Sequence, residues 1–222
     1  NITGFAYKYL ELKYDVNNND GSGQTGYIIN FPQDTECDIL IVAGGGGGGQ
    51  YNAGGGGAGG VIFIAKHILR TGSYIVNVGD GATGGPRETG RPSLYPAGKR
   101  GNNSKLTSID NSSMEWKAIG GGNGGGDDYY GVPGGSGGGG ADDGTNGGPG
   151  ISVQASQGTL YDNIGTHYGN DGGDGRTGGN GSAGAGGGGA GEKGFNNTNG
   201  RHGGDGKYFG DIFGTNVGDE GW

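Results

Sequence analysis

The 222-residue sequence is poor in the residues that stabilise most globular domains. Aromatic residues make up 9% of the chain and all hydrophobic residues 29%, so we expect one small apolar core at most. The most apolar stretch, 39–43, has the length of a strand and is far shorter than the ~18 residues of a membrane span. A single cysteine, Cys37, excludes an intrachain disulfide. The sequence therefore predicts neither a disulfide-rich scaffold nor insertion into a membrane.

Positive charge and proline are scarce as well. The chain has 14 lysine and arginine residues against 22 aspartate and glutamate residues, which gives a net charge of −8. A surface of this charge repels phosphate groups, so nucleic-acid binding is not expected. Only six prolines accompany the glycines, and the Gly-X-Y register is not continuous, which excludes a collagen triple helix.

Glycine is the abundant residue, with 65 positions in the chain, against a usual share of roughly 7%. Inside a helix each glycine is less favourable than alanine by roughly 1 kcal/mol, so long helices cannot form from this composition. Helical bundles and doubly wound α/β folds are therefore excluded. We expect an all-β protein with almost no α-helix.

Residues 1–119 contain short runs that have the pattern of strands. Some alternate between apolar and polar residues, and others are continuously apolar, as in strands buried on both faces. Glycine- and asparagine-rich turns separate them, which favours a β-sandwich over this region. The predicted strands are Phe5–Tyr9, Tyr27–Phe31, Cys37–Val42, Val61–Ile64, Tyr74–Val78, Leu106–Ile109 and Met114–Ile119.

Residues 120–222 show a three-residue period, in which glycine occupies every third position from Gly169 to Gly187. A helix repeats every 3.6 residues and a strand every two, whereas polyproline II has three residues per turn. Such threads have no internal hydrogen bonds, but neighbouring threads can bond to each other where no Cβ intrudes. We expect a bundle of polyglycine II helices over 120–222, packed as one compact unit with the sandwich.

Two glycine blocks at 44–60 interrupt the predicted sandwich between two buried strands, and we expect them to supply the central threads of the bundle. The glycines predicted to form this lattice are Gly44, Gly45, Gly46, Gly47, Gly48, Gly49, Gly54, Gly55, Gly56, Gly57, Gly169, Gly172, Gly175, Gly178, Gly181, Gly184 and Gly187.

The order of motifs resembles a known glycine-rich domain family. A buried strand runs into polyglycine at Cys37–Gly49, polyglycine runs into a strand at Gly54–Ile62, and a Gly-x-Tyr-x-Val-x-Val-Gly pattern follows at Gly72–Gly79. Relatives of this kind occur in bacteriophage tail fibres and adhesins, in virion proteins of large DNA viruses and, more distantly, in the extracellular region of anaplastic lymphoma kinase. The resemblance implies a sandwich of tumour-necrosis-factor-like or jelly-roll type that carries polyglycine II helices. The receptor's disulfides and membrane anchor have no counterpart here, which favours the viral branch.

No pattern in the sequence predicts catalysis, a cofactor or a metal site. His67, His167 and His202 lie far apart, and neither a nucleophile elbow nor a zinc-binding helix motif occurs. Cys37 begins the most buried predicted strand, so we expect an inert structural thiol. The segment 170–175 resembles part of a calcium-binding nonapeptide, but the nine-residue repeat is missing. We therefore expect a protein that is not an enzyme.

Four tyrosines between the glycine tracts are the best candidates for recognition. They lie where threads of the bundle turn around, and aromatic residues on rigid loops are good anchors for a partner or a sugar. Packing against the bundle or a neighbouring subunit is an equally good explanation. These tyrosines are Tyr129, Tyr130, Tyr161 and Tyr168.

Two further features concern the surface. The C-terminus is unusually apolar at Phe209, Phe213 and Trp222, so we expect it to return to the sandwich or to enter a subunit interface. Candidate N-glycosylation acceptors in Asn-x-Ser/Thr sequons are Asn102, Asn111 and Asn196.

We expect a non-enzymatic structural protein of a virion surface, fibre or similar extracellular assembly, with a stiff glycine lattice as its mechanical element. Its partners would be other subunits of the assembly, including copies of itself. An alternative is a receptor-binding adhesin whose bundle-end loops contact a host glycan or protein. A third hypothesis is ice binding, which needs a flat face of small residues; Arg176, Lys193 and Arg201 would roughen that face.

Overall fold

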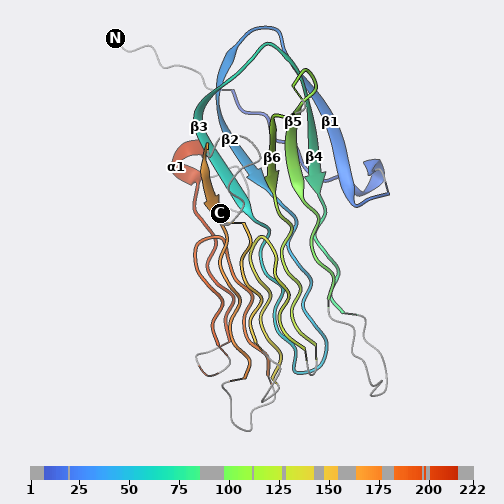
Figure 1. The fold of residues 1–222 in the computed structure, drawn as a ribbon, viewed down its shortest axis with the longest axis vertical. Helices are drawn as coiled ribbons and strands as arrows, with labels where there is room; N and C mark the ends of the chain where they lie inside the picture. Colours follow the sequence, from blue (N-terminus) through green and yellow to red (C-terminus); the bar gives the residue numbers. More distant parts are fainter. Residues whose placement is uncertain are drawn as a thin grey trace.

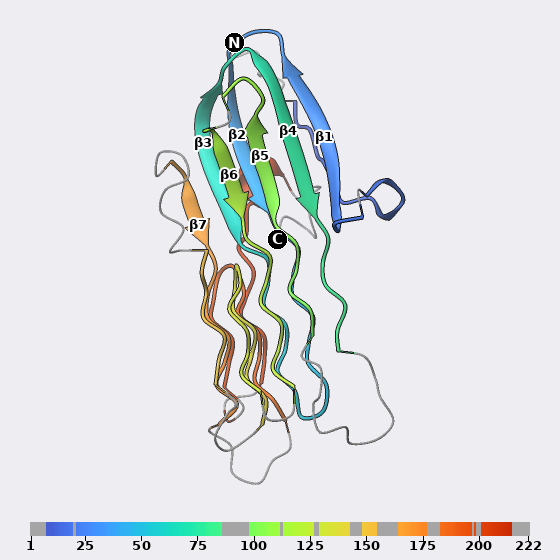
Figure 2. The same cartoon turned by 45° about the vertical axis from the view of Figure 1, so that its right-hand side comes forward.

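A computed structural model describes residues 8–19, 21–85, 98–111, 113–126, 129–142, 148–154, 164–176, 183–196, 198 and 201–214. One end of the molecule is a β-sandwich, and the other is a bundle of extended threads that run roughly parallel to the long axis (Figure 1). The threads leave the sandwich from one end, so the molecule is elongated (Figure 2).

The sandwich consists of two antiparallel sheets, one with the strand order β1-β4-β5-β6 and the other with the order β2-β3-β7. The described residues contain two short helices beside these strands, η1 and α1. The elements are η1 (Val16–Asn18), β1 (Gln24–Phe31), β2 (Thr35–Val42), β3 (Val61–Leu69), β4 (Gly72–Gly79), β5 (Ser104–Ser108), β6 (Glu115–Ala118), β7 (Thr166–Tyr168) and α1 (Gly210–Phe213). The prediction of an all-β protein with almost no α-helix is confirmed.

Strands β1 to β6 each overlap one of the seven predicted runs, although the bounds differ, most of all in β3, which continues to Leu69. The first predicted run, Phe5–Tyr9, lies mostly outside the described residues, and Tyr9 is an exposed residue without strand structure. Strand β7 has no counterpart among the predicted strands. It is only three residues long and pairs with Val61–Phe63 of β3, so its position depends on β3 rather than on a local pattern.

The apolar core lies between the two sheets and is small, as the composition requires. Ile62 and Ile64 of β3 face Tyr74, Leu106 and other residues of the opposite sheet, and these four side chains are at most 6% exposed. Burial alternates along β5, as expected for a strand with one face on a core. Cys37 packs against this core, and its burial raises the pKa of the thiol, consistent with an unreactive structural residue.

The C-terminal segment covers the outer face of the three-stranded sheet. The Phe63 ring of β3 lies 5.6 Å from that of Phe209 and 6.0 Å from that of Phe213, measured between centroids. Phe209 also packs edge-on against Tyr168 of β7 at 5.6 Å. The apolar C-terminal residues thus return to the sandwich at Phe209 and Phe213, whereas Trp222 lies outside the described residues.

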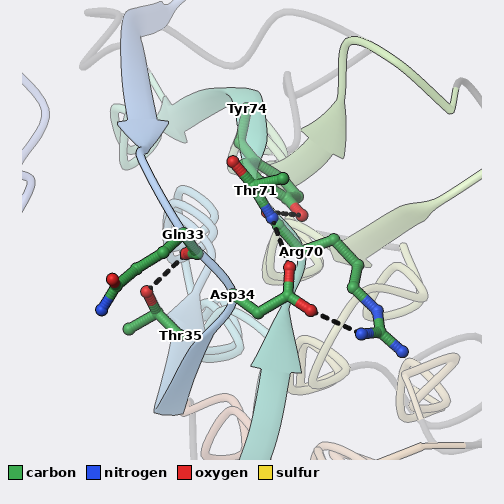
Figure 3. A network of polar contacts seen from close by, with 6 residues as sticks. All are labelled: Gln33, Asp34, Thr35, Arg70, Thr71 and Tyr74. Atoms are coloured by element: carbon green, nitrogen blue, oxygen red, sulfur yellow. Dashed lines mark hydrogen bonds and ion pairs between the residues drawn. The ribbon is translucent and has the colours of Figure 1, made fainter.

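A polar network closes the sandwich at the end away from the threads (Figure 3). Asp34, between β1 and β2, accepts the Thr71 N–H at 2.8 Å and pairs with the Arg70 guanidinium, both between β3 and β4. The Thr71 N–H, and after it Arg70, hold the pKa of Asp34 below its usual value. The Tyr74 hydroxyl donates to the Arg70 carbonyl at 3.0 Å. These bonds join the two connections, β1 to β2 and β3 to β4, through which the chain crosses from one sheet to the other.

Candidate functional site

The threads are bonded to each other through their backbones at every third residue. The Gly46 N–H donates to the Gly57 carbonyl at 2.8 Å, and the Gly49 N–H donates to the Gly54 carbonyl at 3.1 Å. From the first bond to the second, the donor moves three residues forward in the sequence and the acceptor three residues back. A β ladder repeats every two residues instead. The three-residue repeat is that of polyglycine II. We call the bonded segments the lattice: 43–49, 53–60, 80–85, 98–103, 119–126, 129–133, 134–141, 148–153, 169–175, 183–189, 191–196 and 201–206.

Strands run directly into lattice threads, so hydrogen bonding continues from the sandwich into the lattice. The β2–β3 ladder ends at Val42 opposite Val61, and the next residues continue with a bond from the Ala43 N–H to the Gly60 carbonyl at 3.0 Å. From there the repeat changes from two residues to three. Segments from both sides of residue 119 contribute to the sandwich and to the lattice.

A single thread bonds to several neighbours, so the lattice extends in three dimensions and is not a curled sheet. In thread 43–49, the Gly44 and Gly47 N–H groups donate to carbonyls of thread 98–103. The carbonyls of the same two glycines accept from the Gly121 and Gly124 N–H groups of thread 119–126. The main chain thus forms contacts that side chains form in an ordinary core.

Close approach of the threads requires the absence of side chains at most lattice positions. A Cβ added at Gly46 or Gly47 would lie less than 3.0 Å from backbone atoms of neighbouring threads, which real Cβ atoms essentially never do. At Gly45 the nearest atom, the Gly57 carbonyl oxygen, is 3.7 Å away, which is ordinary contact. Gly48 is open in the same way. Successive residues of thread 43–49 therefore point to three faces in turn, and the pattern repeats every three residues. Two of these faces are crowded and one is open.

The three-residue glycine period near the C-terminal end of the chain has the same steric origin. At Gly169, Gly172 and Gly175 an added Cβ would collide with three carbonyl oxygens of thread 134–141, which are themselves three residues apart. The glycines of the periodic run do not all lie in one thread. Gly184 and Gly187 belong to a second thread that faces 53–60, whereas Gly178 and Gly181 lie outside the described residues.

The few polar side chains inside the lattice are hydrogen-bonded. Ser136 is fully buried; its hydroxyl donates to the Gly189 carbonyl at 3.1 Å and accepts from the Asn170 N–H at 3.3 Å. Gln154 is also fully buried, at the junction with the sandwich, where its Oε1 accepts the Ile119 N–H at 2.7 Å. These residues satisfy backbone groups where the glycine repeat is interrupted.

The structure separates the tyrosines that the sequence singles out. Tyr129 and Tyr130 are 39% and 55% exposed. They follow the far end of thread 119–126, which leaves the sandwich from β6, and the Tyr129 N–H donates to the Gly126 carbonyl there. We call this end of the lattice, away from the sandwich, the tip. Tyr168 lies at the opposite end, in β7, where it lines a small cleft with Asn170 and Lys207. The Lys207 ammonium lies 5.3 Å from the centre of the Tyr168 ring. Tyr161 is outside the described residues.

The tip contains a charged pair beside Tyr130 that local sequence reasoning misses. The Arg176 guanidinium donates to the Asp174 carboxylate through Nε at 3.1 Å and Nη2 at 2.8 Å. A Cβ built on Gly148 would lie 3.1 Å from the Tyr130 ring and 3.7 Å from Arg176 Cζ, so both groups pack over this glycine. The three segments are distant in the sequence, and only the folding of the threads brings them together.

The three predicted glycosylation acceptors differ in accessibility. Asn102 is part of the lattice, where its carbonyl accepts the Gly44 N–H, and the hydroxyl residue of its sequon, Ser104, is 3% exposed. Asn196 accepts the Asp174 N–H through its side chain at 2.8 Å. Asn111 is exposed in the turn between β5 and β6, with its side chain accepting the Ser113 N–H.

Among the described residues, no group of three or more histidine, cysteine, aspartate or glutamate side chains is arranged to hold a metal ion. In the same part of the chain, no helix has the length and apolar character needed to cross a membrane.

Comparison with known proteins identifies a family for this chain. A family model described as a glycine-rich domain matches residues 20–220, which include the sandwich, the lattice and the tip. The chain belongs to the glycine-rich domain family. No curated protein and no solved structure matches it.

Proposed function

We propose that this glycine-rich domain is a non-enzymatic structural protein of a virion surface, a fibre or a comparable extracellular assembly. The observation that carries the proposal is the three-dimensional backbone bonding of the lattice, for example at Gly44 and Gly47. A set of parallel threads cross-linked in several directions resists bending, and it does so without a large apolar core. Continuity between strands and threads would transmit force along the long axis.

The backbone bonding also explains why such a protein suits an exposed environment. Each intramolecular hydrogen bond contributes about 0.5–1.5 kcal/mol net, and the lattice contains many of them in a regular array. Proteolysis requires a segment to open locally, and a bonded interior thread such as 183–189 cannot open without breaking bonds to several neighbours. We therefore expect the described threads to resist proteases.

The experiment is to label material from the producing source with gold-conjugated antibodies against the sandwich and to image it by electron microscopy. A structural subunit gives many copies at regular spacing on a capsid, fibre or extracellular surface. Labelling confined to dispersed intracellular protein would contradict the proposal. Mass measurement of the native particle would give the number of copies, which we expect to exceed one.

A second candidate function is an adhesin, and the exposed tip favours it. Tyr129 and Tyr130 are held on a rigid support, and rigid aromatic side chains lose little entropy on binding. The partner would be a host surface glycan or protein. Replacing both tyrosines by alanine tests this function: lost attachment to host cells with normal assembly supports an adhesin, and unchanged attachment contradicts it. Ice binding is less well supported, because Glu192, Lys193 and Arg201 are exposed charged residues on the lattice.

A further inference from the structure

The guanidinium of Arg176 at the tip is held in one orientation and remains half exposed. Its Nε–H and one Nη2–H bond to Asp174, whose Oδ1 also accepts the Arg176 backbone N–H at 2.9 Å. The Arg176 side chain is 45% exposed and the Asp174 side chain is 21% exposed. An arginine has five N–H donors, and Asp174 takes two of them, so three are not bonded to Asp174 or to another of the described residues. A fixed guanidinium with available donors suits a planar oxyanion.

The ring of Tyr130 lies beside this guanidinium. Gly148 is buried between the two groups, and its lack of a side chain lets both approach the same point. Tyr130 as a whole residue is 55% exposed. The side-chain bond to Asp174 raises the pKa of Arg176 further above its usual range, so the group stays charged at all relevant pH values.

We propose that Tyr130 and Arg176 together bind a sugar that carries a carboxylate, such as a uronic or sialic acid. The ring would pack against the apolar C–H face of the sugar, and the available guanidinium N–H groups would donate to its carboxylate. A neutral sugar would use the ring alone, and a simple carboxylate the guanidinium alone. The inference rests on the adhesin function proposed above and names the chemistry of its ligand.

The chain contains a matched control at its other end. Arg70 and Asp34 also form an arginine–aspartate ion pair, through Nη1 of Arg70, with side chains 76% and 43% exposed. Tyr74, the tyrosine next to this pair in Figure 3, is 2% exposed and therefore offers no ring surface. Arg70 has the charge of Arg176 without the exposed aromatic neighbour, so it separates a specific site from general attraction of anions to an arginine.

The experiment is a titration of the full, isotopically labelled chain with sodium glucuronate, N-acetylneuraminate, galactose and acetate, followed by NMR. We expect both acidic sugars to shift the amide signals of Gly148, Asp174 and Arg176, with galactose and acetate binding about tenfold more weakly or worse. Arg176→Gln and Tyr130→Ala should each weaken acidic-sugar binding about tenfold. Arg70→Gln should leave it unchanged, and Arg176→Lys, which keeps the charge but loses the fork, should be intermediate.

Equal binding of galactose and glucuronate, unchanged binding by Arg176→Gln, or no response to either acidic sugar would each overturn the inference. Unperturbed spectra for the sandwich residues establish that a variant is folded. Host-cell attachment separates this failure from failure of the adhesin function. If attachment needs Tyr130 but tolerates Arg176→Gln, the acidic-sugar inference is wrong and the adhesin function stands. If attachment tolerates the double variant Tyr129→Ala with Tyr130→Ala, both are wrong.

Discussion

The sandwich and the lattice are parts of one chain that satisfy buried backbone groups in different ways. In the sandwich, strands bond to each other within a sheet, and side chains such as Ile64 and Trp116 fill the space between the sheets. In the lattice, threads bond in several directions, and the space between them has no room for side chains at most positions.

The difference reverses the usual rule of core mutations. Removing a methyl group from the sandwich core leaves a cavity, whereas adding one to a crowded lattice face forces threads apart. It also explains the composition: a chain with few large apolar residues can still bury much of its backbone if glycine occupies the contact positions. The predictions that follow test this contrast, from the largest expected effect to the smallest.

Gly47→Ala should have the largest effect. The added methyl group would collide with the backbone at Thr83 and Gly84. Lattice bonds hold this segment in place, from the Lys99 N–H to the Thr83 carbonyl and from the Gly85 N–H to the Gly48 carbonyl. We expect a loss of about 3 kcal/mol or more in the free energy of unfolding, measured by urea denaturation. Gly48→Ala is the adjacent control on the open face. Equal stabilities for the two variants would refute the steric account of the lattice.

Ile64→Ala tests the opposite rule in the sandwich. Ile64 is fully buried between the sheets, so truncation should reduce the free energy of unfolding by about 3 kcal/mol through lost burial and a residual cavity. Ile28, which is 68% exposed on β1, is the control, and Ile28→Ala should change stability by less than about 0.5 kcal/mol. Hydrogen exchange in Ile64→Ala should further show whether the lattice opens together with the sandwich or separately.

The sequence predicted both regions but not how they meet. Alternation of residues such as those at Tyr74–Val78 revealed strands because the pattern is local. The three-residue glycine period revealed threads for the same reason: each periodic glycine faces one neighbour. Which thread neighbours which is decided by contacts between distant segments, and glycine tracts are too alike to specify a partner. Strand β7 is missed for a similar reason, because its position depends on pairing with the distant strand β3.

The tip shows the same limit for the candidate site. Tyr129 and Tyr130 stand out in the sequence because they interrupt glycine tracts. Their neighbour Arg176 does not, because its proximity depends on turns of the chain at both ends of the lattice. The ion pair between Arg176 and Asp174 joins residues two positions apart, but nothing in the sequence places that pair beside Tyr130.

The ion pairs at the two ends should give smaller, pH-dependent effects. Hydrogen bonds to Asp34 and Asp174 lower both pKa values, chiefly the Thr71 N–H in the first case and the Arg176 side chain in the second. A carboxyl with a lowered folded-state pKa stabilises the fold above its unfolded value of about 3.9 and loses this contribution as the pH falls through the folded value. Stability should therefore be level near neutral pH and fall below about pH 4.

Asp34→Asn and Asp174→Asn separate the two ends in the same measurement. Each variant should be slightly less stable than the parent at pH 7, and the difference should shrink on acidification, because the parent carboxyl then becomes neutral as well. Thermal melts between pH 7 and pH 2 check this. A difference that grows at low pH would mean that the carboxylate does not stabilise the folded state.

Gly45→Ala should give the smallest effect, and one of the opposite sign from Gly47→Ala. The open face at Gly45 leaves room for a methyl group, and its backbone is not in the left-handed region that disfavours alanine. Alanine also has less conformational freedom than glycine in the unfolded chain, so the substitution should stabilise the protein by about 0.4–1 kcal/mol. Gly48→Ala should behave alike, and the two gains should add because the positions lie one turn apart. A measured loss at both positions would mean that the open face is covered in solution, which the sedimentation behaviour of the parent protein would then reveal as self-association.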